Sequence, residues 1–145
     1  MDSTFSSPLG AHTLHRLTHD PEIWLTTVDA SGTPQPRPVW FIWDGERVTI
    51  YSSAKAWKLK HIAAHPNVAL HFNSDPITYD FQVILGEAII DSDAPSVLNY
   101  PPYLDKYAGL IPALDMTIAE YSNVFRIAIR VTPTRLRGTE PIPQP

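Results

Sequence analysis

The sequence predicts a mainly β protein with small helices, in which six antiparallel strands form a closed or partly closed barrel. Runs rich in β-branched and aromatic residues recur along the chain, and turns that contain proline or glycine separate them. Only two or three segments have the spacing of short helices. The 145 residues are the length of one domain. We therefore expect one barrel domain over residues 1–138 and a flexible C-terminal tail over residues 139–145.

The strands are expected from residue type and from the turns between them. They cover residues 23–30, 34–43, 47–53, 67–73, 80–91 and 124–137. In the second strand Pro34, Pro36 and Pro38 occupy alternate positions. Proline cannot donate a ladder hydrogen bond, so this strand should face a sheet edge or a gap. The pair Asp44–Gly45 is a strong signal for a tight hairpin between the second and third strands.

A short helix is expected after the third strand, over residues 54–64. Ser52 or Ser53 can cap its start, because a serine side chain accepts a hydrogen bond from a first-turn N–H group. Pro66 should end the helix. The residues expected on its buried face are Leu59, Ile62 and Ala63.

The second half of the chain contains a bulge signal and an irregular segment. Gly86 interrupts the fifth strand and predicts a β-bulge. Residues 93–121 read as irregular to helical. The loop over residues 93–123, with Tyr100, Tyr103 and Tyr107, is expected to form the variable wall of a ligand pocket. The last strand should provide the clearest core seam, which consists of Phe125, Ile127, Ile129 and Val131.

Composition narrows the function classes. The net charge is −4 and the chain has no cysteine, so a general nucleic-acid binder and thiolate chemistry are both disfavoured. The first twenty residues are polar and interrupted by Pro8 and Gly10, without a secretory apolar core. No apolar run reaches the length of a membrane span. We expect a cytoplasmic protein that binds neither nucleic acid nor membrane.

A local cluster of cations stands out in this acidic chain. Three of its four lysines, Lys55, Lys58 and Lys60, lie within six residues. Lys55 and Lys58 are one helical turn apart at a helix start, an arrangement that favours a phosphate or carboxylate. Lys60 falls on another face and is expected to be a solvent lysine. The alternative is that all three lysines only solubilise an exposed helix.

The segment before the lysines is aromatic on both faces. Trp40 and Ile42 share one face of the strand, and Phe41 and Trp43 share the other. The aromatic rings of Trp40, Phe41, Trp43 and Tyr51 could form a floor for a flat conjugated ring, or simply pack in the core and in interfaces. A strand that is apolar on both faces needs two covers, of which the core supplies one. We expect a partner subunit or a ligand to supply the second, and hence a homodimer.

Neither a metal site nor a catalytic nucleophile is predicted. His12, His15 and His19 could share a helical face, but no carboxylate completes a ligand set. His61 and His65 are expected to be solvent histidines as well, and His71 is expected at a pocket edge or an interface. No nucleophile motif is present, so any chemistry should belong to a bound cofactor.

Several segments together resemble a known family. They are the strand–turn–strand TVDASGTPQPRPVWF, the WDG hairpin, the YSS strand end, KLKHIAAHPNVALHF and the closing RVTPTRLRG. Their order over residues 14–138 resembles the pyridoxamine 5'-phosphate oxidase-like split β-barrels, most closely the branch of coenzyme F420 (deazaflavin)-dependent oxidoreductases. The resemblance implies a six-stranded split barrel of the FMN-binding type, which dimerises and holds cofactors in grooves between subunits.

The resemblance also implies where the cofactor lies. Its ring would lie along Pro38–Trp40, and its phosphate would lie around Ser52, Ser53 and Lys58. Arg37 and Lys55 add positive charge, and Lys55 and Trp57 depart from the small or acidic residues typical of those positions. The expected cofactor-binding residues are Arg37, Pro38, Val39, Trp40, Tyr51, Ser52, Ser53, Lys55, Lys58 and Leu59. No catalytic side chain is expected.

Three functions remain open from the sequence. The first is hydride transfer between reduced F420 and a small unsaturated or redox-active substrate. The second is an FMN-binding oxidase or reductase of the same fold. The third is a non-catalytic protein that binds deazaflavin or a tetrapyrrole. F420 carries a phosphate and a polyglutamate tail, whereas FMN carries only the phosphate, so the surplus cations favour F420.

Overall fold

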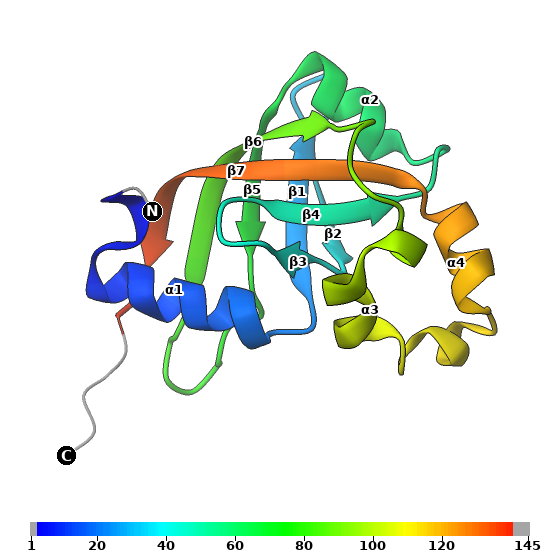
Figure 1. Ribbon diagram of the computed structural model, residues 1–145. Helices are drawn as coiled ribbons and strands as arrows, with labels where there is room; N and C mark the ends of the chain where they lie inside the picture. Colours follow the sequence, from blue (N-terminus) through cyan, green and yellow to red (C-terminus); the bar gives the residue numbers. More distant parts are fainter. Residues whose placement is uncertain (1–2, 141–145) are drawn as a thin grey trace.

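One antiparallel sheet of seven strands forms the body of the protein in a computed structural model that describes residues 3–140 (Figure 1). The strands are β1 Ile23–Val28, β2 Pro34–Val39, β3 Ile42–Trp43, β4 Val48–Ser52, β5 Asn67–His71, β6 Gln82–Ile90 and β7 Ile127–Gly138. The α-helices are α1 Pro8–His19, α2 Trp57–Ala64, α3 Pro101–Tyr107 and α4 Ile118–Val124, and the 3-10 helices are η1 Ser3–Phe5, η2 Val97–Asn99 and η3 Ile111–Leu114. The expectation of a mainly β fold with small helices is confirmed.

The sheet curls into a split-barrel-like half-barrel. Its strand order is β2-β1-β5-β6-β7-β4-β3, which places β2 and β3 at opposite edges. Only Trp40 and Phe41 separate these two strands in sequence, so the two edges must approach each other at this point. In Figure 1, α2 sits at the upper end of the sheet and α1 at the lower end, while α3 and α4 lie together on the right.

The prediction of six strands is wrong by one, because the expected second strand is two strands. Pairing with β1 ends at Val39, and pairing with β4 begins at Ile42. Between them, the backbone of Phe41 is hydrogen-bonded by side chains of α3 instead of by a strand. The hairpin at Asp44–Gly45 is confirmed, with Gly45 at φ 98° and the Asp44 N–H donating to the Arg47 carbonyl.

Two separate cores pack on the two faces of this aromatic segment. Phe41 and Trp43 belong to the core inside the barrel, with Ile50, Leu70 and Ile129. On the other face Trp40 and Ile42 pack against a second cluster, which consists of Tyr51, Val97, Tyr103, Tyr107, Ile111, Tyr121 and Ala128. The alternation of faces expected from the sequence is thus confirmed.

Residues of the same chain cover the second apolar face of the segment Trp40–Trp43. η2, α3, η3 and α4 supply most of the second cluster, and Trp40 and Ile42 pack against it half-buried without a partner subunit. The sequence argument that this strand requires a second subunit or a ligand is therefore wrong. Tyr103 and Tyr107 are fully buried in this cluster, so they are core residues and not a pocket wall.

The helix boundaries differ from the expected ones. α2 begins at Trp57 after Ala56, which has no side-chain cap, because Ser52 still belongs to β4 and its hydroxyl donates to the Ser53 carbonyl. Serine capping of this helix is therefore wrong. Ile62 is buried as expected and Leu59 packs against the barrel core, but Ala63 is exposed.

The N-terminal segment forms a helix that the sequence reading missed. Ser7 caps α1 by accepting from the Gly10 N–H at 3.0 Å, and Pro8 occupies the first turn, where a missing N–H group has no effect. His12 on this helix is not a solvent histidine, because its Nε2 lies 3.1 Å from Asp80 Oδ1.

The C-terminal strand shows one confirmation and one correction. A register shift between Leu85 and Gly86 confirms the predicted bulge opposite β7. β7 begins at Ile127 rather than at residue 124, since Val124 ends α4.

The expected flexible tail begins with a residue that is still hydrogen-bonded to the sheet. The Thr139 N–H donates to the Phe81 carbonyl at 2.9 Å. Residues 141–145 lie outside the described part of the chain. Within residues 3–140 no helix is long and apolar enough to cross a membrane.

Candidate functional site

A cleft of about 910 Å³ lies between α2 and the β1–β2 hairpin. Known small-molecule sites occupy about 300–1,000 Å³, so the cleft can hold a ligand of cofactor size. The residues that line it are Leu25, Thr27, Asp29, Ala30, Ser31, Gln35, Arg37, Pro38, Ala56, Trp57, Lys58, Lys60, His61 and Ala64. Figure 1 shows α2 and the turn between β1 and β2 at the upper end of the sheet.

Strand register explains which side chains reach the cleft. Leu25 pairs with Arg37, and Thr27 pairs with Gln35, so these four side chains share one face of the hairpin. β2 is an edge strand, which confirms the expectation drawn from its alternating prolines. The open edge next to α2 leaves the Arg37 side chain exposed on the cleft.

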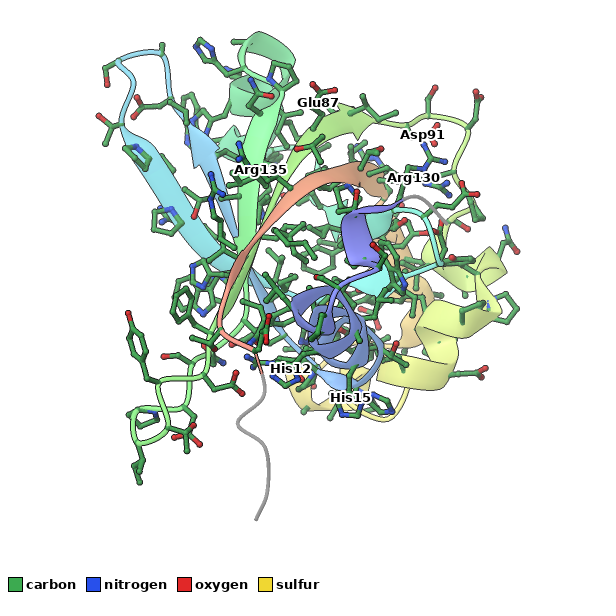
Figure 2. All side chains as sticks on the ribbon, turned by 90° about the vertical axis from the view of Figure 1, so that its left-hand side faces the viewer. His12, His15, Glu87, Asp91, Arg130 and Arg135 are labelled. Atoms are coloured by element: carbon green, nitrogen blue, oxygen red, sulfur yellow. The ribbon has the colours of Figure 1, made fainter. Side chains whose placement is uncertain are left out.

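Three cations line the cleft without an acidic partner. Arg37, Lys58 and Lys60 take part in none of the ion pairs found among residues 3–140. Those ion pairs are His12–Asp80, Arg16–Asp20 and Arg130–Asp91. Figure 2 labels His12, Asp91 and Arg130, none of which lies on α2, β1 or β2. Burial lowers the pKa of Lys58, and the neighbouring charge of Arg37 lowers it further. A bound anion would relieve this repulsion.

The single carboxylate of the cleft is occupied by its own turn. Asp29 Oδ1 accepts from the Ser31 hydroxyl at 2.7 Å and from the Thr33 N–H at 2.9 Å, and Oδ2 accepts from Gln35 at 3.0 Å. The hydrogen bond from Ser31, followed by those from Thr33 and Gln35, lowers the pKa of Asp29 to about 2. Asp29 therefore remains ionised at neutral pH and shapes the turn that closes one end of the cleft.

An exposed tryptophan and a lysine form the outer rim of the cleft. Trp57 is 70% exposed, and Lys60 Nζ lies 4.7 Å from the centroid of its ring. Lys60 is exposed, as expected for a solvent lysine, but it also lines the cleft, which was not expected.

His61 and Thr27 form a hydrogen bond on the cleft wall. His61 Nδ1 lies 2.8 Å from Thr27 Oγ1, and Thr27 is only 2% exposed. The expectation that His61 is a solvent histidine is therefore wrong. His65, one turn further, is exposed and lies outside the cleft lining.

Of the ten residues expected to bind a cofactor, three line the cleft. They are Arg37, Pro38 and Lys58. Lys55 is exposed just before α2, while Val39 and Leu59 pack against the barrel core. The seven residues outside the lining are Val39, Trp40, Tyr51, Ser52, Ser53, Lys55 and Leu59.

Two of the four aromatic residues considered for a ring floor, Trp40 and Tyr51, belong to the second cluster, and the other two, Phe41 and Trp43, belong to the barrel core. The Trp40 ring stacks on Tyr107 at 4.5 Å between centroids and on Tyr121 at 5.6 Å. The Tyr51 hydroxyl donates to the Pro95 carbonyl at 2.7 Å, and burial raises the pKa of Tyr51 to about 12. Both rings therefore serve packing within the chain.

Sequence reasoning missed Thr27, Gln35 and His61 as residues of the cleft. His61 follows Lys58 by three positions, which places both on one helical face, and this spacing was an available signal. The contact with Thr27 spans 34 positions in sequence and has no local signature. Among the described residues, no group of three or more histidines or carboxylates is arranged to hold a metal ion.

A curled antiparallel sheet with a cation-lined cleft at its open edge defines a split-barrel-like protein. Residues 11–138 match the family described as pyridoxamine 5'-phosphate oxidase, and the chain belongs to this family. No curated protein matches the chain.

Solved structures with the same fold have different recorded roles. An F420 reductase is 29% identical and superposes with a TM-score of 0.67 over 85% of this chain and 94% of its own. A conserved hypothetical protein from Mycobacterium tuberculosis is 18% identical, with a TM-score of 0.70 over 90% of this chain and 83% of its own. The heme storage protein HutZ from Vibrio cholerae is 17% identical, with a TM-score of 0.62 over 90% and 94%. The last two similarities concern the fold alone.

Proposed function

We propose that the protein is an oxidoreductase that binds coenzyme F420 and transfers a hydride between the reduced deazaflavin and a small unsaturated or redox-active substrate. The observation that carries this proposal is the set of cations on the cleft. Arg37, Lys58 and Lys60 line it without an ion-pair partner among the described residues. Lys58 is half-buried, and a partly buried cation without a partner is costly unless an anionic ligand neutralises it.

The choice of F420 over other ligands rests on charge and on similarity. F420 has a phosphate and a polyglutamate tail, and three cations can contact more than one anionic group. The 29% identity to an F420 reductase over 85% of the chain supports the same choice. In this proposal Lys58 and Arg37 hold the phosphate, Lys60 meets the acidic tail, and Pro38 borders the ring. The deazaflavin supplies the hydride when it is bound, so the chain needs no nucleophile.

Two alternatives to F420 can be distinguished by measuring ligand binding and turnover. FMN would occupy the cleft with its phosphate alone and would depend less on Lys60. A non-catalytic carrier of a deazaflavin or a tetrapyrrole would bind its ligand without turnover, and the fold similarity to a heme storage protein is the observation in its favour. Similarity of fold does not decide between them.

We further propose that the protein is a homodimer. The face of the sheet turned away from the barrel core carries half-buried side chains, most of them apolar. Trp24, Thr26, Ala69, His71, Val83 and Leu85 form adjacent rows across β1, β5 and β6. On this face Trp24 stacks on His71, with ring centroids 5.9 Å apart and planes 3° from parallel. A self-complementary face of this kind suits a two-fold interface.

Fluorescence titration with F420 and with FMN, side by side, tests the proposed ligand. Lys58→Ala should weaken F420 binding by about tenfold or more, because it removes a charge-assisted contact. Lys60→Ala should weaken F420 more than FMN. Lys55→Ala is the matched control, since Lys55 is exposed outside the cleft lining and should change affinity by less than about twofold.

Turnover is measured separately as oxidation of reduced F420 in the presence of activated alkenes and quinones. Binding without turnover of any of them would favour the carrier. Failure of F420 to bind, or equal losses in all three lysine variants, would refute the proposed function.

A further inference from the structure

The cleft contains a histidine whose orientation is fixed by a buried hydroxyl group. The distance from His61 Nδ1 to Thr27 Oγ1 is 2.8 Å, and Thr27 is a buried residue near the end of β1. This bond occupies Nδ1. Nε2, on the opposite side of the ring, is therefore the nitrogen that remains available to a ligand.

We infer that His61 is an anion-binding group of the cleft, positioned by Thr27, and that its protonation strengthens the binding of a phosphate-like oxyanion beside Lys58. The inference rests on the proposed function, because it extends the same anion site. His61 lies one helical turn after Lys58 on α2, and both residues line the cleft. Side chains with this spacing are neighbours on a helix surface, so one oxyanion can contact both.

The charged surroundings favour an anion at this place. α2 packs against β1 and β6. Asp29 follows β1 and is saturated by the hydrogen bonds of its own turn, and Arg37 on β2 lies on the cleft. β6 carries one titratable side chain, Glu87, which is exposed (Figure 2). The remaining charged or titratable groups belong to α2 and its end, and they are Lys58, Lys60 and His65.

The sign of the pH effect follows from linkage. A histidine gains positive charge as the pH falls from 8 to 5. An anion that contacts the ring binds the charged form more tightly, so its affinity must rise as the pH falls. The same coupling requires that a bound anion moves the titration midpoint of His61 to higher pH.

Sulfate is a suitable probe, since its charge does not change between pH 5 and 8. We expect sulfate to bind the wild-type protein about tenfold more tightly at pH 5.5 than at pH 8. NMR spectra of the imidazole rings should show the midpoint of His61 rising on addition of sulfate. His65 on the same helix is the internal control, and its midpoint should shift much less, because it lies outside the cleft lining.

Variants separate a positioning role for Thr27 from a merely structural one. His61→Gln should abolish most of the pH dependence of sulfate binding, whereas His65→Gln should preserve it. Thr27→Val keeps the shape of the side chain but removes the hydroxyl, and should reduce the midpoint shift of His61. Thr27→Ser restores the hydroxyl and should restore the shift. Circular dichroism of each variant confirms that it is folded.

The outcomes distinguish this inference from the proposed function. If F420 and FMN both fail to bind but sulfate still raises the midpoint of His61, the proposed function falls and the anion site remains. If F420 binds while sulfate and F420 both leave the midpoint of His61 unchanged, the inference about His61 is overturned. A response of His61 and His65 of equal size would also overturn it.

Discussion

The hydroxyl of Tyr107 accepts a hydrogen bond from the backbone N–H of Phe41 at 2.9 Å and lies 2.7 Å from the carbonyl of Pro21. Phe41 is the residue at which the chain crosses from one edge of the sheet to the other, so its backbone has no strand partner. Its carbonyl is bonded by Lys106 Nζ at 3.0 Å. Two consecutive side chains of α3 therefore satisfy the buried backbone that joins β2 to β3.

Removal of the Tyr107 hydroxyl should destabilise the protein. Tyr107→Phe keeps the ring, which is fully buried, but leaves the Phe41 N–H without its partner. An unsatisfied buried donor costs about 1–3 kcal/mol, so the free energy of unfolding should fall by that amount. Tyr79→Phe is the control: Tyr79 is 75% exposed, and its change should stay within about 0.5 kcal/mol. Urea unfolding measures both, and equal effects would contradict this role of Tyr107.

Lys106 should make stability increase with pH in the alkaline range. Burial lowers the pKa of Lys106 to about 8, with Asp20 opposing the shift, while an unfolded lysine titrates near 10.4. Between these values the unfolded chain binds more protons than the folded one, so the free energy of unfolding rises with pH. Because the side chain is partly exposed, we expect about 1–2 kcal/mol between pH 7.5 and 9.5.

The variant Lys106→Met isolates this contribution. It removes the titrating amine, so the difference in unfolding free energy between wild type and variant should change with pH across this window. Buried tyrosines such as Tyr103 and Tyr107, whose pKa values burial raises, affect both proteins alike and oppose stability only as the pH approaches 10. A difference that is constant from pH 7.5 to 9.5 would show that Lys106 does not titrate there.

The bulge at Gly86 should not tolerate a side chain. A Cβ atom at Gly86 would lie 2.7 Å from the backbone oxygen of Thr132 and 2.8 Å from Cγ1 of Val131. The backbone oxygen belongs to β7 and cannot move without disturbing the ladder, so Gly86→Ala should cost about 1–3 kcal/mol. At Gly109 a Cβ meets nothing within 4 Å, and Gly109→Ala should be neutral or slightly stabilising. Thermal unfolding distinguishes the two, and a neutral Gly86→Ala would refute the close approach.

Features that depend on local chemistry were predictable from the sequence. Gly86 predicts a bulge and the pair Asp44–Gly45 predicts a hairpin, because glycine adopts backbone geometry that other residues avoid. The alternation of Trp40 to Trp43 correctly predicted two apolar faces. What covers the second face was not predictable, since residues 97–121 fold back over it through contacts that are distant in sequence.

The candidate site was predictable only in part for the same reason. Lys58 and Arg37 stand out by charge in an acidic chain. The expected cap at Ser52 or Ser53 failed because β4 extends through Ser52 and pairs with β7, so the serine lies in a strand where a helix start was expected. Thr27 and His61 meet only after β1 and α2 pack together, and periodicity within either element cannot reveal the contact.

The open face of the sheet should be the contact surface between two subunits. If two copies associate through the rows of Trp24, Ala69 and Leu85, a charge placed among them should separate the subunits, because an unpaired charge in an apolar interface is costly. Leu85→Lys should therefore sediment as a monomer at micromolar concentration, whereas the wild type sediments as a dimer. An interface of the obligate kind buries about 2,000 Å² or more, so wild-type dissociation should be undetectable at that concentration. Leu114→Lys is the control, since Leu114 is 48% exposed on η3 and belongs to none of these strand rows, and the variant should remain dimeric. A monomeric wild type, or a Leu85→Lys variant that is folded and still dimeric, would exclude this face as the interface.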